Sequence, residues 1–192
     1  MFRLKSLVGW RARLALAGAL AAAVMHGQAA PSAKGGAQSL WVGAEYADLG
    51  AGFPVDSTLR LSGVGAYGIF NWNHHYGVEG HVRFLNFNSW NGETEQDYLA
   101  GPRYTFLHSN RWRPFASFQV GMVKIQYPFS MGNGNSFAMA PGGGLEYKVS
   151  HKWSVRAAYE YQYLMNSPNF NDEPKFGIKP NGPLAGISYR IF

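Results

Sequence analysis

Between Ser39 and the C-terminus, large apolar residues alternate with charged or small residues at every second position, and no run shows a helical period. This alternation recurs over eight segments and constrains the fold more than any other feature, because it is typical of strands with two chemically different faces. The predicted strands are Leu40–Asp48, Leu59–Phe70, Tyr76–Asn86, Asp97–Leu107, Phe115–Gln126, Phe137–Val149, Trp153–Met165 and Leu184–Phe192.

The connections between these segments alternate in length. The first, third, fifth and seventh are longer and polar, as in "NSPNFNDEPKFGIKPNG", whereas the second, fourth and sixth are short, as in "SHK". Long loops at one end and short periplasmic turns at the other are typical of outer-membrane barrels, whose strands span the bilayer with about 9 to 11 residues. The sequence therefore predicts an all-β fold, namely an eight-stranded antiparallel up-and-down transmembrane β-barrel.

The composition of the two strand faces favours a membrane barrel over a soluble one. The polar face offers only one or two charges per strand, of both signs, between Gly and Ala, which fits the narrow lumen of an eight-stranded barrel. The apolar face then contacts lipid, and the first strand must pair with the last because hydrocarbon cannot satisfy an open sheet edge. We assign to the lipid face Val42, Ala44, Tyr46, Leu61, Tyr67, Ile69, Tyr76, Val78, Val82, Phe84, Tyr98, Tyr104, Phe106, Phe118, Val120, Met122, Met139, Leu145, Tyr147, Val155, Tyr159, Tyr161 and Tyr163.

The charged residues of the opposite face are expected to form a structural ion-pair network that fills the lumen, because an unpaired buried charge costs several kcal/mol. A sharper alternative is a narrow gated ion path, or a proton-sensitive plug, built on the histidine of this set. The predicted lumen network comprises Glu45, Arg60, Glu79, His81, Arg83, Arg103, Glu146, Lys148, Arg156, Glu160 and Arg190.

Prolines at two positions fall inside predicted strands. Pro102 and Pro141 each remove a hydrogen bond from the strand ladder. We therefore expect a local bulge, or a place at the rim of the bilayer, at both residues.

The N-terminus predicts export. Four basic residues within 1–13 precede the apolar run Leu14–Met25 and the small residues of "HGQAA", which is the pattern of a secretory signal peptide. We expect a signal peptide at 1–29, a short periplasmic segment at 30–38 and the barrel domain at 39–192. Cleavage leaves 13 Lys and Arg against 11 Asp and Glu, a net charge of +2, so the basic balance gives no support for nucleic-acid binding.

Four stretches carry a family resemblance: "YLAGPRYTF" (98–106), "APGGGLEYKVSHKWSVR" (140–156), "YEYQY" (159–163) and "GISYRIF" (186–192). Together they resemble the outer membrane protein A-like β-barrel family, in particular its small single-domain members from the Gram-negative cell envelope. The resemblance implies an outer-membrane location and, for Phe192, a part in the signal that the barrel-assembly machinery recognises. One departure is that strict alternation puts Tyr189 and Ile191 on the lipid face and turns Phe192 inward.

The sequence does not predict an enzyme. Small outer-membrane barrels include lipid-modifying enzymes, which need a nucleophile and a base held together near the lipid. Outside the predicted signal peptide, His81 is the one histidine within a predicted strand, whereas His74, His75, His108 and His151 fall at the predicted turns. We expect no catalytic residues, no cofactor and no metal site.

The long loops provide the remaining candidate contact residues, Trp90, Phe170 and Phe176, because exposed loop aromatics are frequent in binding sites. The expected partners are therefore the outer-membrane bilayer, the assembly machinery and possible unknown extracellular ligands. The hypothesis that best fits the sequence is a structural, envelope-integrity role. An adhesin-like or ligand-binding barrel is the second hypothesis, and a narrow ion path or a lipid-modifying enzyme is the third.

Overall fold

The computed structural model describes residues 38–50, 60–87, 94–106, 111–126, 133–165 and 179–192. The predicted signal peptide (1–29) and residues 30–37 lie outside them. Among the described residues, no helix has the length and apolar character needed to cross a membrane. Their regular structure consists of β1 (Ser39–Gly50), β2 (Arg60–Asn71), β3 (Tyr76–Phe87), β4 (Thr94–Thr105), β5 (Trp112–Gln126), β6 (Asn133–Lys148), β7 (Trp153–Tyr161), β8 (Tyr163–Met165) and β9 (Asn181–Arg190).

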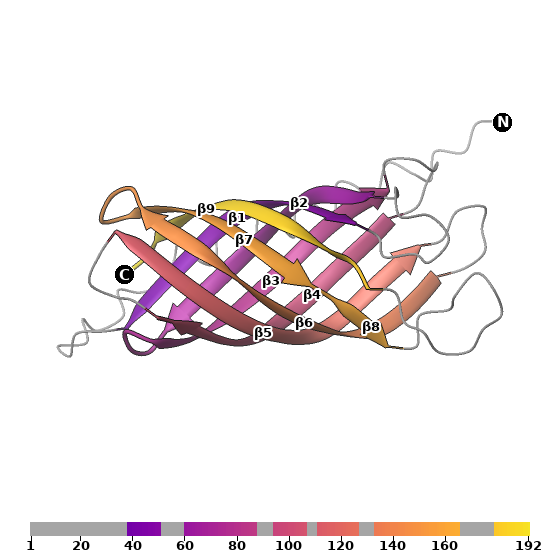
Figure 1. Cartoon of the computed structure of the whole chain (residues 1–192), viewed down its shortest axis with the longest axis horizontal. Helices are drawn as coiled ribbons and strands as arrows, with labels where there is room; N and C mark the ends of the chain where they lie inside the picture. The colour runs from indigo at the N-terminus through magenta and orange to yellow at the C-terminus, as the bar shows by residue number, and fades with distance from the viewer. Residues whose placement is uncertain (1–37, 51–59, 88–93, 107–110, 127–132, 166–178) are drawn as a thin grey trace, which may run out of the picture. The chain divides into compact units, whose positions relative to one another are not determined.

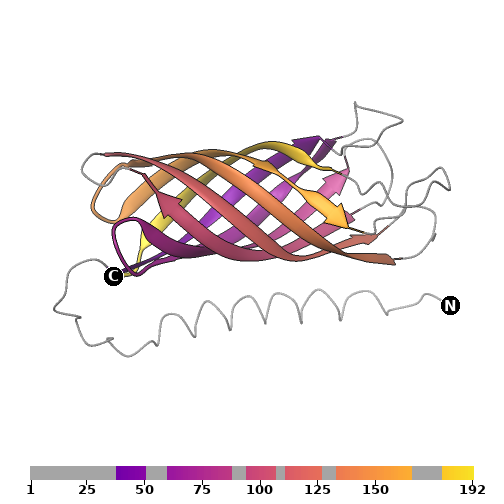
Figure 2. The same ribbon diagram turned by 60° about the horizontal axis from the view of Figure 1, so that its bottom comes forward.

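The strands form one closed antiparallel barrel (Figures 1 and 2). Each strand pairs with its neighbour in sequence, and β1 pairs with β9, with Trp41 opposite Arg190 and Gly50 opposite Asn181. β7 and β8 are two parts of one strand, separated at Gln162, and both pair with β6 in the same register. Eight spanning strands result, so the predicted fold class is confirmed.

The two ends of the barrel differ. One end, called here the short-turn end, carries Phe192 and the turns Trp72–His75 and Val149–Lys152. Side chains close both turns, because Asn73 Oδ1 accepts hydrogen bonds from the main-chain N–H groups of His75 (2.8 Å) and Tyr76 (2.6 Å), and Ser150 Oγ accepts those of Lys152 (3.2 Å) and Trp153 (3.1 Å). The connections 51–59, 88–93, 127–132 and 166–180 leave the strands at the opposite end, the loop end; the first and last of them are the longest in the barrel.

Pro102 and Pro141 interrupt the strand ladder without the expected bulge. The pairing of β4 with β3 runs through Pro102, whereas its pairing with β5 stops at Ala100 and resumes in unchanged register at Arg103. Pro141 lies opposite Phe118 of β5, but the pairing of β6 with β7 and β8 has a gap there, which is why the strand divides at Gln162. Each proline therefore removes hydrogen bonds of the strand ladder toward one neighbouring strand, but no extra residue is inserted and the register is unchanged.

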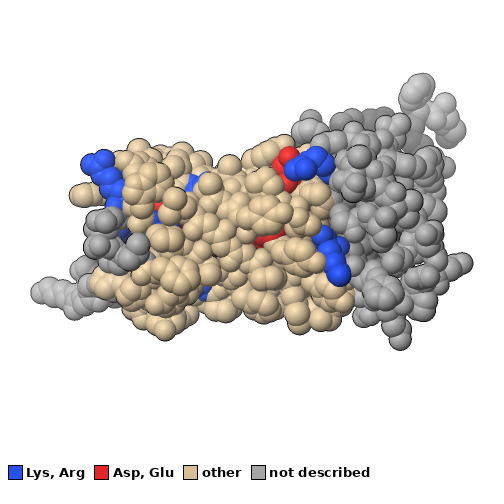
Figure 3. All heavy atoms as spheres, viewed as in Figure 1, with Lys and Arg blue, Asp and Glu red and all other residues tan. Residues whose placement is uncertain are grey.

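The outer surface of the barrel is apolar. Exposed large side chains follow each other at every second residue, for example Val82 and Phe84 on β3 and Phe118, Val120 and Met122 on β5. In Figure 3 the middle of the visible face is mostly uncharged, and the blue and red side chains gather toward its two ends. The alternation predicted from the sequence thus sorts the residues into an apolar exterior and a polar interior on most strands.

Strand β2 is the exception, because its phase is opposite to the predicted one. Leu61 (0% exposed), Tyr67 (4%) and Ile69 (2%) point into the barrel rather than toward lipid, while Val64 is 63% exposed. Arg60, expected in the lumen, lies on the outer face at the loop end and pairs with Asp48 at 2.7 Å. The assignment was wrong because this strand carries apolar residues on both faces, and the lumen itself accepts apolar side chains near its ends.

Candidate functional site

The lumen is filled by charged side chains that come from five strands. Inward positions of β3 place three of them at successive alternate residues, and β1, β4, β6 and β7 supply their partners from the surrounding wall. All are almost completely buried, with no member of the set more than 5% exposed. The predicted residues that the structure brings together here are Glu45, Glu79, His81, Arg83, Arg103, Glu146, Arg156 and Glu160.

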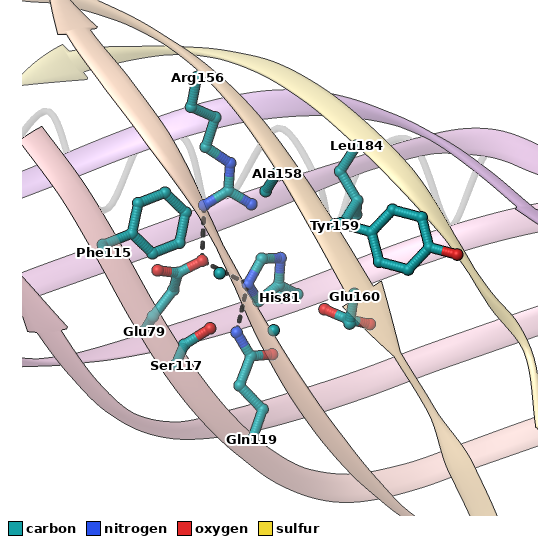
Figure 4. Close-up of a pocket in the computed structure, with 12 residues that line it drawn as sticks. Glu79, His81, Phe115, Ser117, Gln119, Arg156, Ala158, Tyr159, Glu160 and Leu184 are labelled. Carbon is teal, nitrogen blue, oxygen red and sulfur yellow. Dashed lines mark hydrogen bonds and ion pairs between the residues drawn. The ribbon is translucent and has the colours of Figure 1, made fainter. Parts of the chain in front are cut away.

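Glu79 is shared by three basic side chains, and Figure 4 shows its contacts with Arg156 and His81. Its Oε1 accepts from Arg156 Nη1 at 2.5 Å and lies 2.7 Å from His81 Nε2, while its Oε2 accepts from Arg103. Two guanidinium groups and an imidazole therefore share one carboxylate. Such charge-assisted contacts are strong where water is excluded, and they compensate the large cost of burying the individual ions.

His81 lies between two carboxylates. Its Nδ1 is 2.6 Å from Glu45 Oε1 and its Nε2 is 2.7 Å from Glu79 Oε1, with the Gln119 side-chain amide also 2.7 Å from Nε2. Glu45 in turn accepts a hydrogen bond from Arg156 Nη2, which joins β1 to β7 across the lumen. Both ring nitrogens of His81 are thus occupied by groups that hold the side chain in place.

A second part of the network surrounds Arg83 on the side of the loop end. Arg83 Nη2 donates to Glu160 at 2.6 Å, and its Nε lies 3.2 Å from Asp97 Oδ2. The Gln162 amide donates to both carboxylates, at 2.9 Å to Glu160 and 3.1 Å to Asp97. Two acidic groups here therefore share one guanidinium and one amide.

Glu95 and Asp97 line the lumen on β4 but were not among the predicted network residues. They are 1% and 0% exposed. The predicted strand began at Asp97 and left Glu95 in the preceding loop, although the period of two continues from Leu99 back through both carboxylates. Arg113 was missed for a similar reason, because the strand was begun at Phe115, two residues after it.

A third part of the network lies toward the short-turn end and combines ion pairs with aromatic rings. Glu146 forms salt bridges with Arg103 at 2.8 Å and with Arg113 at 3.1 Å. The guanidinium groups also cover aromatic faces: Arg103 lies 3.8 Å from the Phe115 ring centroid and Arg113 lies 5.1 Å from that of Trp41. Arg156 covers Tyr67 in the same way at 3.7 Å, and the aromatic faces add cation–π attraction to the ion pairs.

Apolar clusters close the lumen beyond the charges. At the loop end the barrel interior is packed with Leu49, Leu61, Leu85 and Phe87 on one side and with Leu99, Val123, Ile125 and Leu164 on the other. Toward the short-turn end Trp41, Tyr67 and Ile69 form a further cluster. Between these layers lies a cavity of about 10 Å³, which is the space that one water molecule needs.

Close packing inside the barrel also depends on inward glycines. A Cβ atom built on Gly43 would lie 2.6 Å from the Tyr67 ring, so the absence of a side chain there lets the ring lie flat across β1. Tyr67 in turn stacks on His81 with ring centroids 5.9 Å apart. The small residues of the polar face are therefore the space into which the large lumen side chains fit.

The remaining predicted site residues lie elsewhere. Lys148 is half buried and Arg190 exposed at the short-turn end, where neither forms a salt bridge with a described carboxylate side chain; Arg190 Nε donates to the main-chain oxygen of Phe192 at 2.9 Å. Phe192 follows the end of β9 and is 48% exposed, so it does not turn inward as strict alternation predicted; Ile191 is exposed as well. Trp90, Phe170 and Phe176 lie outside the described residues. Within the described part of the chain, no three His, Asp or Glu side chains are grouped so as to hold a metal ion.

Comparison with known proteins agrees with this architecture. The model of the outer membrane protein beta-barrel domain matches residues 14–190. No curated protein matches the chain. Among solved structures, Neisserial surface protein A superimposes with a TM-score of 0.59 and 13% identity, covering 79% of this chain and 96% of its own.

Two barrels from Pseudomonas aeruginosa are also similar. The N-terminal β-barrel domain of OprF gives a TM-score of 0.56 at 14% identity, covering 81% of this chain and 98% of its own. The outer membrane protein OprG gives 0.53 at 11% identity, covering 81% and 96%. At these identities the superpositions show a shared fold, and the family match extends over most of the sequence. The chain therefore belongs to the outer membrane protein β-barrel domain family.

Proposed function

We propose that this protein is a closed structural barrel of the outer membrane, which contributes to the integrity of the envelope rather than forming a pore. The observation that carries this proposal is the filled lumen. Apolar clusters lie toward both ends, and a buried ion-pair network lies between them. A barrel with eight strands has room for side chains but not for an aqueous channel of porin size.

The outer face supports a place in the bilayer. Large apolar side chains such as Val64, Phe84 and Met122 are 49–63% exposed around the barrel, an arrangement that would be unfavourable in water and is favourable in hydrocarbon. The family of the chain supports the outer membrane as that bilayer. We propose that the short-turn end faces the periplasm, that residues 1–29 direct export, and that Phe192 takes part in recognition by the assembly machinery.

The geometry around His81 favours a structural role over catalysis. Both ring nitrogens face carboxylates, and the groups in contact with them are Glu45, Glu79 and Gln119 rather than a hydroxyl. A general base must be within hydrogen-bond reach of the proton that it removes. His81 is therefore positioned to hold the network together.

The proposal is tested on mature protein refolded in detergent. Heat-modifiable migration in electrophoresis is expected, followed by absence of steady conductance in planar bilayers and absence of turnover of lipid A or phospholipid. Steady single-channel conductance would contradict the closed lumen, and lipid hydrolysis or acyl transfer would favour the enzymatic alternative. Binding to a host surface that depends on Trp90, Phe170 or Phe176 would favour the adhesin-like alternative.

A further inference from the structure

The short-turn end carries a concentration of positive charge on one side of the barrel. Arg111, Arg113, Lys148, Lys152 and Arg190, called here the basic rim, lie at the adjacent ends of β5, β6, β7 and β9. The main chain ties them in pairs, because the Lys148 N–H donates to the Arg111 carbonyl at 2.9 Å and the Arg190 N–H donates to that of Lys152 at 2.8 Å. Arg113 and Arg190 both lie close enough to Lys148 to repel its ammonium group.

The basic rim has few acidic partners. Glu146 is the one described carboxylate side chain that forms a salt bridge with a cation of the rim, and it is shared between Arg103 and Arg113. The remaining buried carboxylates are held in the network deeper in the lumen, and Asp48 pairs with Arg60 at the loop end. Arg111, Lys152 and Arg190 are exposed and form no salt bridge with a described carboxylate side chain, so the rim has an excess of positive charge.

Aromatic side chains lie beside these cations on the outer face. Trp112 packs against Tyr147 with ring centroids 4.6 Å apart, and Trp153 packs against Tyr189 at 5.1 Å. Lys152 lies 5.9 Å from the Tyr189 ring centroid, and the Arg111 guanidinium donates to the Tyr147 hydroxyl at 3.4 Å. Trp and Tyr at strand ends mark the level of lipid headgroups in membrane proteins. The exposed cations of the basic rim are therefore at headgroup height.

The other side of the short-turn end lacks this concentration of positive charge. The turn Trp72–His75 between β2 and β3 contains histidines but no lysine or arginine. The described cations of the short-turn end thus gather on the side of β5 to β9, which gives one side of the barrel the charge that a phosphate would need.

We propose that the basic rim binds the phosphate of an anionic phospholipid headgroup in the leaflet at the short-turn end. The inference rests on the proposed function, because it needs the barrel to lie in a bilayer. Exposed Arg111, Lys152 and Arg190 would contact the phosphate, and the Trp112–Tyr147 and Trp153–Tyr189 pairs would contact the glycerol backbone and the start of the acyl chains. Each cation near an anionic membrane strengthens binding by about fivefold.

The test compares two triple variants that change the net charge equally. Arg111→Gln, Lys152→Gln and Arg190→Gln remove exposed cations from the basic rim, whereas Arg60→Gln, Lys124→Gln and Lys179→Gln remove exposed cations from the loop end. Dioleoylphosphatidylglycerol or dioleoylphosphatidylcholine is titrated into the detergent-solubilised barrels, and native mass spectrometry counts the lipids retained. The wild type and the loop-end variant should prefer phosphatidylglycerol, and the rim variant should lose on the order of 100-fold of this preference.

Equal losses in both triple variants, or an unchanged preference in the rim variant, would overturn the inference. Displacement of the lipid by equimolar inorganic phosphate, or retention of poly-glutamate as tight as that of phosphatidylglycerol, would also overturn it by showing that any anion suffices. Heat-modifiable migration is recorded on every sample. A folded barrel without lipid preference would contradict this inference alone, whereas a wild type without a mobility shift would contradict the proposed function as well.

Discussion

The carboxylate of Glu79 on β3 and the guanidinium of Arg156 on β7 meet inside the barrel, with 2.5 Å between Oε1 and Nη1, although 77 residues separate them in the sequence. Both side chains are at least 95% buried. Since neither group has access to bulk water, each depends on its buried partners for compensation of its charge.

Removal of Arg156 should therefore destabilise the barrel strongly. Arg156→Gln leaves Glu45 and Glu79 short of a cation, and we expect a loss of about 3–5 kcal/mol in the free energy of unfolding, measured by urea titration in lipid vesicles. Adding Glu79→Gln should restore part of this loss, because the second change removes one of the uncompensated carboxylates.

The control for that experiment is the exposed ion pair at the loop end. Asp48→Asn breaks the contact with Arg60, whose side chain is 46% exposed, and should cost less than about 1 kcal/mol. Additive effects of Arg156→Gln and Glu79→Gln would contradict direct coupling through the lumen.

A charge on the outer face should be costly near the middle of the bilayer. Val82 lies outward on β3, opposite Ala66 of β2 and Tyr98 of β4. We expect Val82→Arg to cost about 2–4 kcal/mol in vesicles, because the charge would enter hydrocarbon. The same change at Gln126, which is exposed at the end of β5, should cost about 0–1 kcal/mol. Similar costs at the two positions would show that the outer face does not lie in lipid.

The corrected phase of β2 can be checked by labelling, because the chain contains no cysteine. A cysteine at Val64 should react with a lipid-soluble maleimide in the folded barrel, whereas one at Leu61 should react after unfolding. Tyr46→Cys, on the outer face of β1, provides the positive control. The mass shift of the intact protein gives the extent of reaction. Faster labelling at Leu61 than at Val64 would restore the phase predicted from the sequence.

The stability of the barrel should be sensitive to a single methyl group added beside the Tyr67 ring. A Cβ on Gly43 would lie 2.5 Å from the Ile187 carbonyl oxygen and 2.6 Å from the Tyr67 ring, so Gly43→Ala should cost about 1–3 kcal/mol through overpacking. Gly80→Ala is the matched control, because the nearest atom to its Cβ would be 3.6 Å away. Urea titration of the two variants should separate them clearly, and equal stability would mean that the ring position adapts without cost.

The number of strands and the order of the strands in the barrel could be predicted from the sequence, because both follow from local alternation and loop length. Glu79, His81 and Arg83 recur at every second residue of a strand with apolar residues between them, so the face of β3 was unambiguous. The phase of β2 was not, because Leu61 and Val64 are both apolar and belong to opposite faces. Alternation identifies a lumen only where the lumen residues are polar.

To predict which residues belong to the charge network, the strand boundaries must be known, and these are harder to predict than the existence of a strand. Glu95 and Asp97 belong to β4 because pairing with β3 and β5 continues to Thr94, opposite Asn86 and Gln126. The period of two from Leu99 back through Asp97 and Glu95 is compatible with that extension, but the residues before Glu95 are equally polar and do not show where the strand begins. The contact between Glu45 and Arg156 could not be predicted from the sequence, since the two residues meet only after closure of the barrel.

That last contact has a consequence for the order of folding. Arg156 bonds to Glu45 across a separation of 111 residues, which joins β1 to the strand that precedes β9. A partly assembled sheet holds the same ions without their partners, and closing so long a loop costs chain entropy before any contact is gained. The network thus favours all-or-none assembly, because an incompletely closed sheet leaves Glu45 of β1 without Arg156 of β7.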